Sequence, residues 1–153
     1  MNTRNLNAFR QQLRLYWVMD GSDLDSETGR ARVTDALQSG VGCVQLRDKH
    51  SDTTILIERT RTLLRLARPW RVLVIVNDRV DVALAAGADG VHLGQSDTPL
   101  AQARAALGTH AVIGLSLEHP DQLAIADAGA ACNLTGGLAD YLAISPVFDT
   151  PTK

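Results

Sequence analysis

The sequence has few cysteines, no excess of basic charge and no long apolar run. Cys43 and Cys132 lie among apolar residues without metal-ligand spacing, so we expect buried thiols in a reducing compartment. The net charge of -2 provides no basic field for nucleic acid. Apolar runs such as Val72–Val76 are too short to cross a membrane, and Met1–Arg14 lacks the apolar stretch of a secretory signal. These absences predict a cytoplasmic protein that binds neither nucleic acid nor membranes.

The length and the patterning favour a single α/β domain. A chain of 153 residues with 45% hydrophobic and 21% charged residues suits one soluble domain with a core. The expected strands are Arg14–Met19, Gly42–Leu46, Val72–Val76, Gly90–Leu93, Ala111–Leu115 and Tyr141–Ile144. The expected helices are Glu27–Gln38, Thr53–Ala67, Arg79–Ala86, Pro99–Leu107 and Pro120–Ala128, with Asp52 and Thr98 as N-caps of the second and the fourth. Strict alternation of strands and helices predicts a parallel sheet covered by helices.

The strand ends carry polar residues instead of glycine-rich phosphate loops. No expected strand leads into a Gly-x-Gly-x-x-Gly turn or a P-loop, which argues against a nucleotide-binding fold. Polar side chains follow the strands instead, namely Arg47 and Lys49, Asn77 and Asp78, Asp97, Ser116, and Ser145 onward. A (β/α)₈ barrel forms its active site from such residues, at the carboxyl ends of its strands.

The number of strands is too small for a closed barrel. Six strands are expected before the chain ends at Lys153, whereas a TIM barrel has eight over roughly 200–250 residues. We therefore expect a single domain over residues 1–153 that contains the first six strands of a (β/α)₈ barrel and is truncated before strands seven and eight. A second chain or another copy would complete it, because open sheet edges are prone to aggregation. The alternative is an open, six-stranded, doubly wound sheet.

The end of the second expected strand is the strongest single signal. Side chains alternate along a strand, so Gln45, Arg47 and Lys49 share one face while Val44 and Leu46 point to the other. An amide and two cations on one face can hold a strongly anionic group. The alternative is a strand that runs out into a solvated turn.

Two carboxylates at neighbouring strand ends predict a metal site. Asp78 follows the third expected strand, and Asp97 lies in the loop after the fourth. Carboxylate oxygens together with substrate phosphate and water suit Mg²⁺. The alternative is that Asp78 caps the Arg79–Ala86 helix and that Asp97 is an ordinary turn residue.

Hydroxyl groups at later strand ends are further candidates. Ser116 ends the fifth expected strand beside Gly114, which leaves room for a ligand. No Asp-His relay accompanies this serine, so we expect it to form a hydrogen bond rather than to act as a nucleophile. The segment Thr150–Lys153 resembles a loop that grips an anion. His92 is interpreted as a residue that lines the barrel, and Tyr16 and Tyr141 as core residues.

These motifs together resemble those of thiamine-phosphate synthases. The matching segments, in the family's order and spacing, are Gln45–Lys49, Val76–Arg79, Gly87–Asp97, Ile113–Ser116 and Pro146–Lys153. The resemblance runs from about Leu15 to Lys153. It implies a transferase of thiamine biosynthesis that joins hydroxymethylpyrimidine diphosphate to thiazole phosphate and releases pyrophosphate.

The resemblance also implies roles for individual residues. Residues matching Gln45, Arg47, Lys49, Asn77 and Lys153 hold the pyrimidine diphosphate, those matching Asp78 and Asp97 bind Mg²⁺, the serine matching Ser116 forms hydrogen bonds within the site, and those matching Thr150 and Thr152 help to hold the thiazole phosphate. The expected catalytic residues are Arg47, Lys49, Ser116 and Lys153.

The chain departs from the family pattern at three places. The family continues past the lysine that matches Lys153 through two more strands with phosphate-binding loops. Asn133–Asp140 replaces the usual Gly-Ala-Asp before the sixth strand, and Leu117–Pro120 differs from the usual Thr-His. The related thiazole tautomerase is one alternative, although Glu118 stands where we expect its catalytic histidine. A catalytically inactive fragment that binds thiamine precursors is the other.

Overall fold

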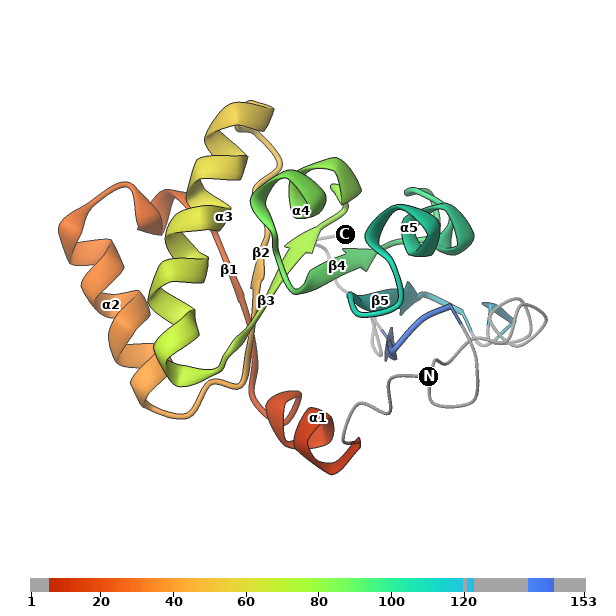
Figure 1. Cartoon of the computed structure of the whole chain (residues 1–153), viewed down its shortest axis with the longest axis horizontal. Helices are drawn as coiled ribbons and strands as arrows, with labels where there is room; N and C mark the ends of the chain where they lie inside the picture. Colours follow the sequence, from red (N-terminus) through yellow and green to blue (C-terminus); the bar gives the residue numbers. More distant parts are fainter. Residues whose placement is uncertain (1–5, 120, 123–137, 145–153) are drawn as a thin grey trace.

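The computed structural model describes residues 6–119, 121–122 and 138–144. Six parallel strands form one sheet in chain order, which is the arrangement of an open barrel (Figure 1). The strands are β1 (Tyr16–Met19), β2 (Cys43–Leu46), β3 (Leu73–Asn77), β4 (Gly90–Leu93), β5 (Val112–Leu117) and β6 (Tyr141–Ile144). The helices are α1 (Leu6–Gln12), α2 (Glu27–Gln38), α3 (Thr53–Ala67), α4 (Val80–Ala86) and α5 (Leu100–Leu107), with short 3₁₀ helices η1 (Gly21–Leu24) and η2 (Arg68–Trp70). The sequential strand order rules out a doubly wound sheet, in which the order reverses from the centre.

The elements lie close to where the sequence predicts them. All six expected strands are present, and α2 and α3 have the expected bounds. Asp52 occupies the N-cap position of α3, but its side chain makes no capping hydrogen bond. Thr98 is not the N-cap of α5, because Pro99 takes that position and the helix begins at Leu100. The helix expected at Pro120–Ala128 lies largely outside the described residues.

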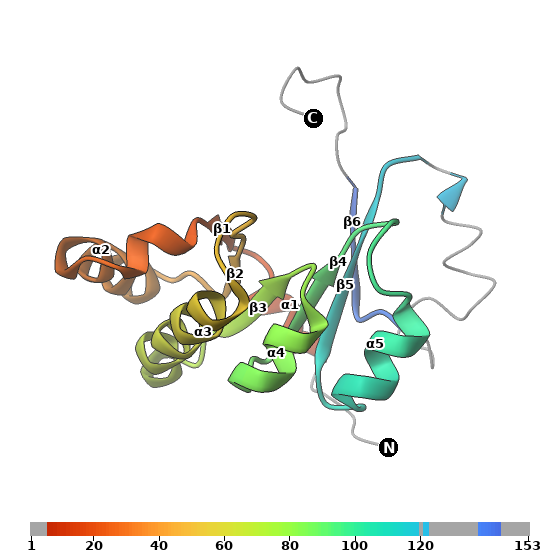
Figure 2. The ribbon, with the colours of Figure 1, turned by 90° about the horizontal axis from the view of Figure 1, so that it is seen from above.

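The two faces of the sheet have different partners. Side chains such as Val44, Leu46 and Val76 are fully buried against the helices. Figure 2 shows α2, α3, α4 and α5 along the same side of the sheet. The alternate residues, Cys43 and Ile75 among them, face the concave side and form a separate cluster. The period of two along β2 and β3 therefore divides a helix-covered face from a barrel interior.

Helix α1 covers the end of the sheet where the strands begin (Figure 1). Phe9 on this helix is 3% exposed and packs with Cys43, Ile75 and Val112 on the concave face. Gln12 Nε2 donates a hydrogen bond to the carbonyl of Arg71 at 2.9 Å. Because this end is covered, the carboxyl ends of the strands remain as the place for a site.

Two aspartates hold neighbouring strands in register by the same contact. Asp89 Oδ2 accepts the amide hydrogen of Val74 at 2.8 Å, and Asp140 Oδ2 accepts that of Ile113 at 2.8 Å. Arg104 on α5 also pairs with Asp140, at 2.7 Å. The altered sequence before β6 therefore keeps the carboxylate contact seen before β4, and β6 joins the sheet in parallel.

The described sheet has two outer strands, β1 and β6. Val18 on β1 is 48% exposed and Ile144 on β6 is 66% exposed, so apolar side chains are open to solvent at both edges. In the described part of the chain, no helix is long and apolar enough to span a membrane.

Candidate active site at the carboxyl ends of the strands

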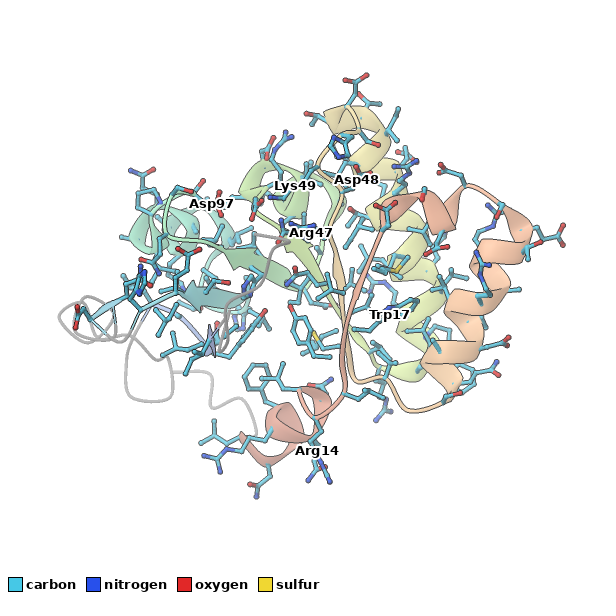
Figure 3. The ribbon with its side chains drawn as sticks, turned by 180° about the vertical axis from the view of Figure 1, so that it is seen from behind. Arg14, Trp17, Arg47, Asp48, Lys49 and Asp97 are labelled. Carbon is cyan, nitrogen blue, oxygen red and sulfur yellow. The ribbon has the colours of Figure 1, made fainter. Side chains whose placement is uncertain are left out.

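Four charged groups meet at one end of the sheet. Burial and the nearby Asp97 carboxyl raise the pKa of Asp78, whereas the positive charges of Lys49 and Arg47 lower it. The four groups follow three different strands: Arg47 and Lys49 follow β2, Asp78 follows β3 and Asp97 follows β4. Figure 3 shows Arg47 and Lys49 at the same end of the molecule as Asp97. The structure thus brings together the two expected metal ligands and two of the expected cations.

Asp78 has an unusual backbone conformation. Its φ is 63°, in the left-handed region that residues other than glycine rarely adopt. Its amide donates to the His92 carbonyl at 2.8 Å, which fixes the end of β3 against β4. Helix α4 begins at Val80 with Arg79 at its N-cap, so the interpretation of Asp78 as a helix cap is wrong. A strained backbone persists only where the surrounding structure holds it in place. Residues of this kind cluster at functional sites.

Asp97 combines a turn with a place in the site. One of its carboxylate oxygens, Oδ2, accepts the Gly94 amide hydrogen at 2.6 Å. The Asp97 amide donates to the Gly94 carbonyl at 3.4 Å, which closes the loop after β4. The expectation of a turn residue and the expectation of a site residue are therefore compatible, since the turn holds the carboxyl beside Asp78.

Asp48, between the two cations, points away from the site toward α3 (Figure 3). Its side chain is 5% exposed and forms an ion pair with Arg59, which also pairs with Asp25. The His50 and Ser51 amides donate to Asp48 Oδ1, each at 3.1 Å. Although burial opposes ionisation, these hydrogen bonds hold the pKa of Asp48 below its usual value.

Arg59 explains an irregularity in the sequence. It interrupts the apolar rhythm of α3, and its side chain is only 14% exposed because it pairs with Asp48. Arg59 anchors Asp48 and so fixes the backbone of this segment. Arg47 and Lys49, on either side of Asp48, are thereby held in place. Arg59 was not expected as a site residue, although a lone arginine on an apolar helix face is the signal that could have identified it.

A chain of hydrogen bonds crosses the concave face beneath the charged groups. Gln45 Nε2 donates to the Tyr16 hydroxyl at 2.7 Å, and that hydroxyl lies 2.7 Å from the Tyr141 hydroxyl. Tyr141 in turn lies 2.9 Å from Nδ1 of His92, whose Nε2 lies 2.8 Å from Oγ of Ser116. The chain links two expected substrate residues, Gln45 and Ser116, through three side chains that sequence reasoning did not assign to the site.

Comparison with known proteins decides the family. A sequence model of the thiamine monophosphate synthase family matches residues 15–153. The chain belongs to this family. It is 43% identical over 148 residues to a thiamine-phosphate synthase of Vibrio campbellii, a match that covers 97% of this chain and 66% of the relative. A thiamine-phosphate synthase of Albidiferax ferrireducens is 43% identical over 143 residues, which are 94% of this chain and 62% of the relative.

A solved structure agrees with this membership. The thiamine phosphate pyrophosphorylase from Pyrococcus furiosus superposes with a TM-score of 0.74 at 35% identity, covering 93% of this chain and 64% of that one. The expected TIM-type fold with six strands is thereby confirmed. The chain spans less than two thirds of the length of these relatives.

Within this family member, Gly114 makes room for a side chain and not for a ligand. A Cβ at this position would overlap the Tyr141 ring and would lie 2.5 Å from His92 Nδ1. The ring centroids of His92 and Tyr141 are 5.5 Å apart. The expectation that Gly114 opens space for a ligand is therefore wrong, because the hydrogen-bonded side chains occupy that space.

Of the remaining expected site residues, the structure describes Asn77 but not Thr150, Thr152 or Lys153. Asn77 ends β3 half-buried, and its carbonyl accepts the Arg79 amide hydrogen at 2.7 Å. Asn77 pairs in register with His92, which places both residues on the concave face. Thr150, Thr152, Lys153 and Cys132 lie outside the described residues.

His92 and Cys43 are buried and uncharged. Burial lowers the pKa of His92 to about 4, so the imidazole is neutral near pH 7, in agreement with a residue that lines the barrel. Burial likewise raises the pKa of the Cys43 thiol to about 12.

Among the described residues, no group of three or more His, Cys, Asp or Glu side chains could hold a metal ion. A metal at Asp78 and Asp97 would therefore need ligands beyond protein carboxylates.

Proposed function

We propose that this chain carries the pyrimidine-diphosphate site of a thiamine-phosphate synthase. The enzyme would couple hydroxymethylpyrimidine diphosphate to thiazole phosphate, giving thiamine phosphate and pyrophosphate. The proposal rests mainly on the position of Asp78. The Asp97 carboxyl and the positive charges of Arg47 and Lys49 all lie close enough to change its pKa. Two carboxylates facing two cations suit a metal-bound diphosphate better than a simple anion.

The chemistry requires stabilisation of a leaving group. The bond from the pyrimidine methylene carbon to the diphosphate oxygen breaks, and the thiazole nitrogen forms a bond to that carbon. Positive charge develops on the pyrimidine while negative charge collects on the departing pyrophosphate. Arg47 and Lys49 hold that negative charge at the end of β2, and Ser116 forms a hydrogen bond within the site. A general base is not needed, because the attacking nitrogen carries no proton.

Asp78 and Asp97 fit Mg²⁺ as the cofactor. Their ligand atoms are oxygens. Burial and the neighbouring Asp97 carboxyl together raise the pKa of Asp78, and a bound cation would relieve the repulsion between the two carboxyls. When bound, the ion would supply charge neutralisation for the diphosphate. Substrate phosphate and water would complete the ligand set.

Several further expectations belong to the same proposal. Lys153 would add a third cation for the diphosphate, and Thr150 and Thr152 would help to hold the thiazole phosphate. Gln45 and Asn77 would contact the pyrimidine diphosphate from the concave face. We further propose a single domain over residues 1–153 whose open edges at β1 and β6 are completed by two more strands, from another chain or in a homo-oligomer. We also propose a cytoplasmic location.

An activity assay on an extended chain tests the proposal. The chain is joined at its C-terminus to the part of the Vibrio campbellii relative that lies beyond the match, and both precursors are supplied with Mg²⁺. We expect thiamine phosphate and pyrophosphate in equal amounts. A folded extended chain that binds both precursors but forms neither product would overturn the proposed activity and favour an inactive binding module.

A further inference from the structure

In the hydrogen-bond chain on the concave face, each group donates to the next one, from Gln45 toward Ser116. It begins at Gln45, which is 5% exposed and whose Nε2 faces the Tyr16 hydroxyl at 2.7 Å. An amide nitrogen only donates, so the Tyr16 oxygen must accept this hydrogen bond. The single hydroxyl hydrogen of Tyr16 is then available for the next group.

The next two links follow from proton counting. Tyr16 donates to the Tyr141 hydroxyl at 2.7 Å, which leaves the hydrogen of Tyr141 for His92 Nδ1 at 2.9 Å. The neighbouring Cys43 thiol does not compete, because sulfur is a much weaker acceptor than a hydroxyl oxygen. Both phenols stay protonated, since burial raises the pKa of each.

The tautomer of His92 decides whether Ser116 accepts or donates in their shared hydrogen bond. A neutral histidine that accepts at Nδ1 carries its hydrogen on Nε2, and Nε2 lies 2.8 Å from Oγ of Ser116. The serine oxygen accepts that hydrogen bond, so its own hydrogen is left for another acceptor. Ser116 is half-buried near the carboxyl end of β5, on the side of the site.

We propose that Tyr141 and His92 are positioning residues: Tyr141 holds His92 as the Nε2–H tautomer, and His92 so makes Ser116 a hydrogen-bond donor to the substrate. This inference rests on the proposed function for the identity of the substrate alone. The direction itself is a property of the chain without any ligand. It explains why polar side chains from five strands occupy an interior that apolar residues could fill.

Nitrogen NMR tests the tautomer directly. The 153-residue chain is labelled with ¹⁵N-histidine, and the His92 signals are identified by their loss in His92→Gln. At pH 7 we expect long-range couplings that assign the hydrogen to Nε2. A hydrogen on Nδ1, or rapid exchange between the two tautomers, would overturn the proposal.

A matched pair of variants tests the cause. Tyr141→Phe removes the donor to Nδ1, so we expect His92 to lose its single tautomer. Tyr16→Phe removes the neighbouring, part-buried hydroxyl but keeps the bond from Tyr141 to His92, so the Nε2–H form should persist. Equal spectra for the two variants would contradict the assigned direction. If Tyr141→Phe fails to fold, Gln45→Glu is the second test, because it replaces the first donor of the chain by an acceptor. Each link should then reverse, and the imidazole hydrogen of His92 should move to Nδ1. An unchanged Nε2–H form would overturn the mechanism.

Ligand binding tests the consequence for Ser116. Calorimetry with hydroxymethylpyrimidine diphosphate and Mg²⁺ should give about fivefold weaker binding for Tyr141→Phe, since one hydrogen bond is worth about 1 kcal/mol. Tyr16→Phe should bind nearly as tightly as the original chain. Equal affinities for the two variants would refute the link from His92 to Ser116. If the original chain does not bind this ligand, the proposed function fails while the NMR result still decides the tautomer.

Discussion

The hydroxyls of Tyr16 and Tyr141 lie 2.7 Å apart, although 125 positions separate these residues in the chain. Tyr16 is on β1 and Tyr141 is on β6, the two outer strands of the described sheet, and their ring centroids are 5.8 Å apart. The sheet therefore curves far enough for its outer strands to meet through side chains across the concave face. This contact spans the interior below the charged groups.

Gly114 is necessary for that contact, so Gly114→Ala should destabilise the fold. The added Cβ overlaps the Tyr141 ring, and overpacking of this kind costs about 2 kcal/mol. Urea unfolding measures the loss. The double variant Gly114→Ala/Tyr141→Leu should lose less than the sum of the single variants, because the leucine vacates the space. Simple additivity would show that the ring and the glycine are not coupled.

Arg59→Leu should destabilise the loop that carries Arg47 and Lys49. It leaves the buried Asp48 carboxylate without its cation, at a cost of about 3 kcal/mol. The His50 and Ser51 amides, which donate to Asp48, should exchange their hydrogens faster. Arg61→Leu on the same helix is the control, since its pair with Glu58 is exposed and should cost at most about 1 kcal/mol. Equal losses for the two variants would remove Arg59 from this role.

The stability of the chain should depend on pH through His92. Below pH 6.5 the unfolded chain binds a proton at this residue, which the folded chain does not bind until about pH 4. The free energy of unfolding should therefore fall by about 3 kcal/mol as the pH drops through this window. Unfolding without added Mg²⁺ at several pH values measures the fall. His92→Gln should show a smaller decrease between pH 6.5 and 4, and an identical pH profile would mean that His92 titrates normally.

Asp78→Asn should raise the Mg²⁺ concentration needed for activity of the extended chain. The substitution removes one of the two carboxylates at the expected metal site, and with it an oxygen ligand that carries negative charge. Titration of the coupling rate with Mg²⁺ gives the half-saturating concentration, which we expect to rise about tenfold or more. An unchanged titration curve would exclude Asp78 as a ligand.

Much of the fold and part of the site could be predicted from the sequence. Strand ends in a parallel barrel point to one end, so the order of strands and helices along the chain is enough to group Arg47, Lys49, Asp78 and Asp97. Local patterns also predict the bounds of α2 and α3.

Other features depend on curvature and packing that no local pattern contains. The meeting of Tyr16 with Tyr141 follows from the bend of the whole sheet, and the left-handed conformation of Asp78 follows from its contact with β4. The pairing of Arg59 with Asp48 joins a helix to a strand end. Helix α1 was not predicted, because its short polar sequence shows no clear apolar period.

The most direct test of the account is the affinity of the 153-residue chain for hydroxymethylpyrimidine diphosphate, measured by calorimetry with and without Mg²⁺. Arg47→Ala is compared with Arg14→Ala, which removes an arginine from the opposite end of the molecule (Figure 3). We predict binding that requires Mg²⁺, weakens about tenfold or more in Arg47→Ala and is unchanged in Arg14→Ala. Equal affinities for the two variants, or binding that is indifferent to Mg²⁺, would contradict a diphosphate site at the carboxyl ends of these strands.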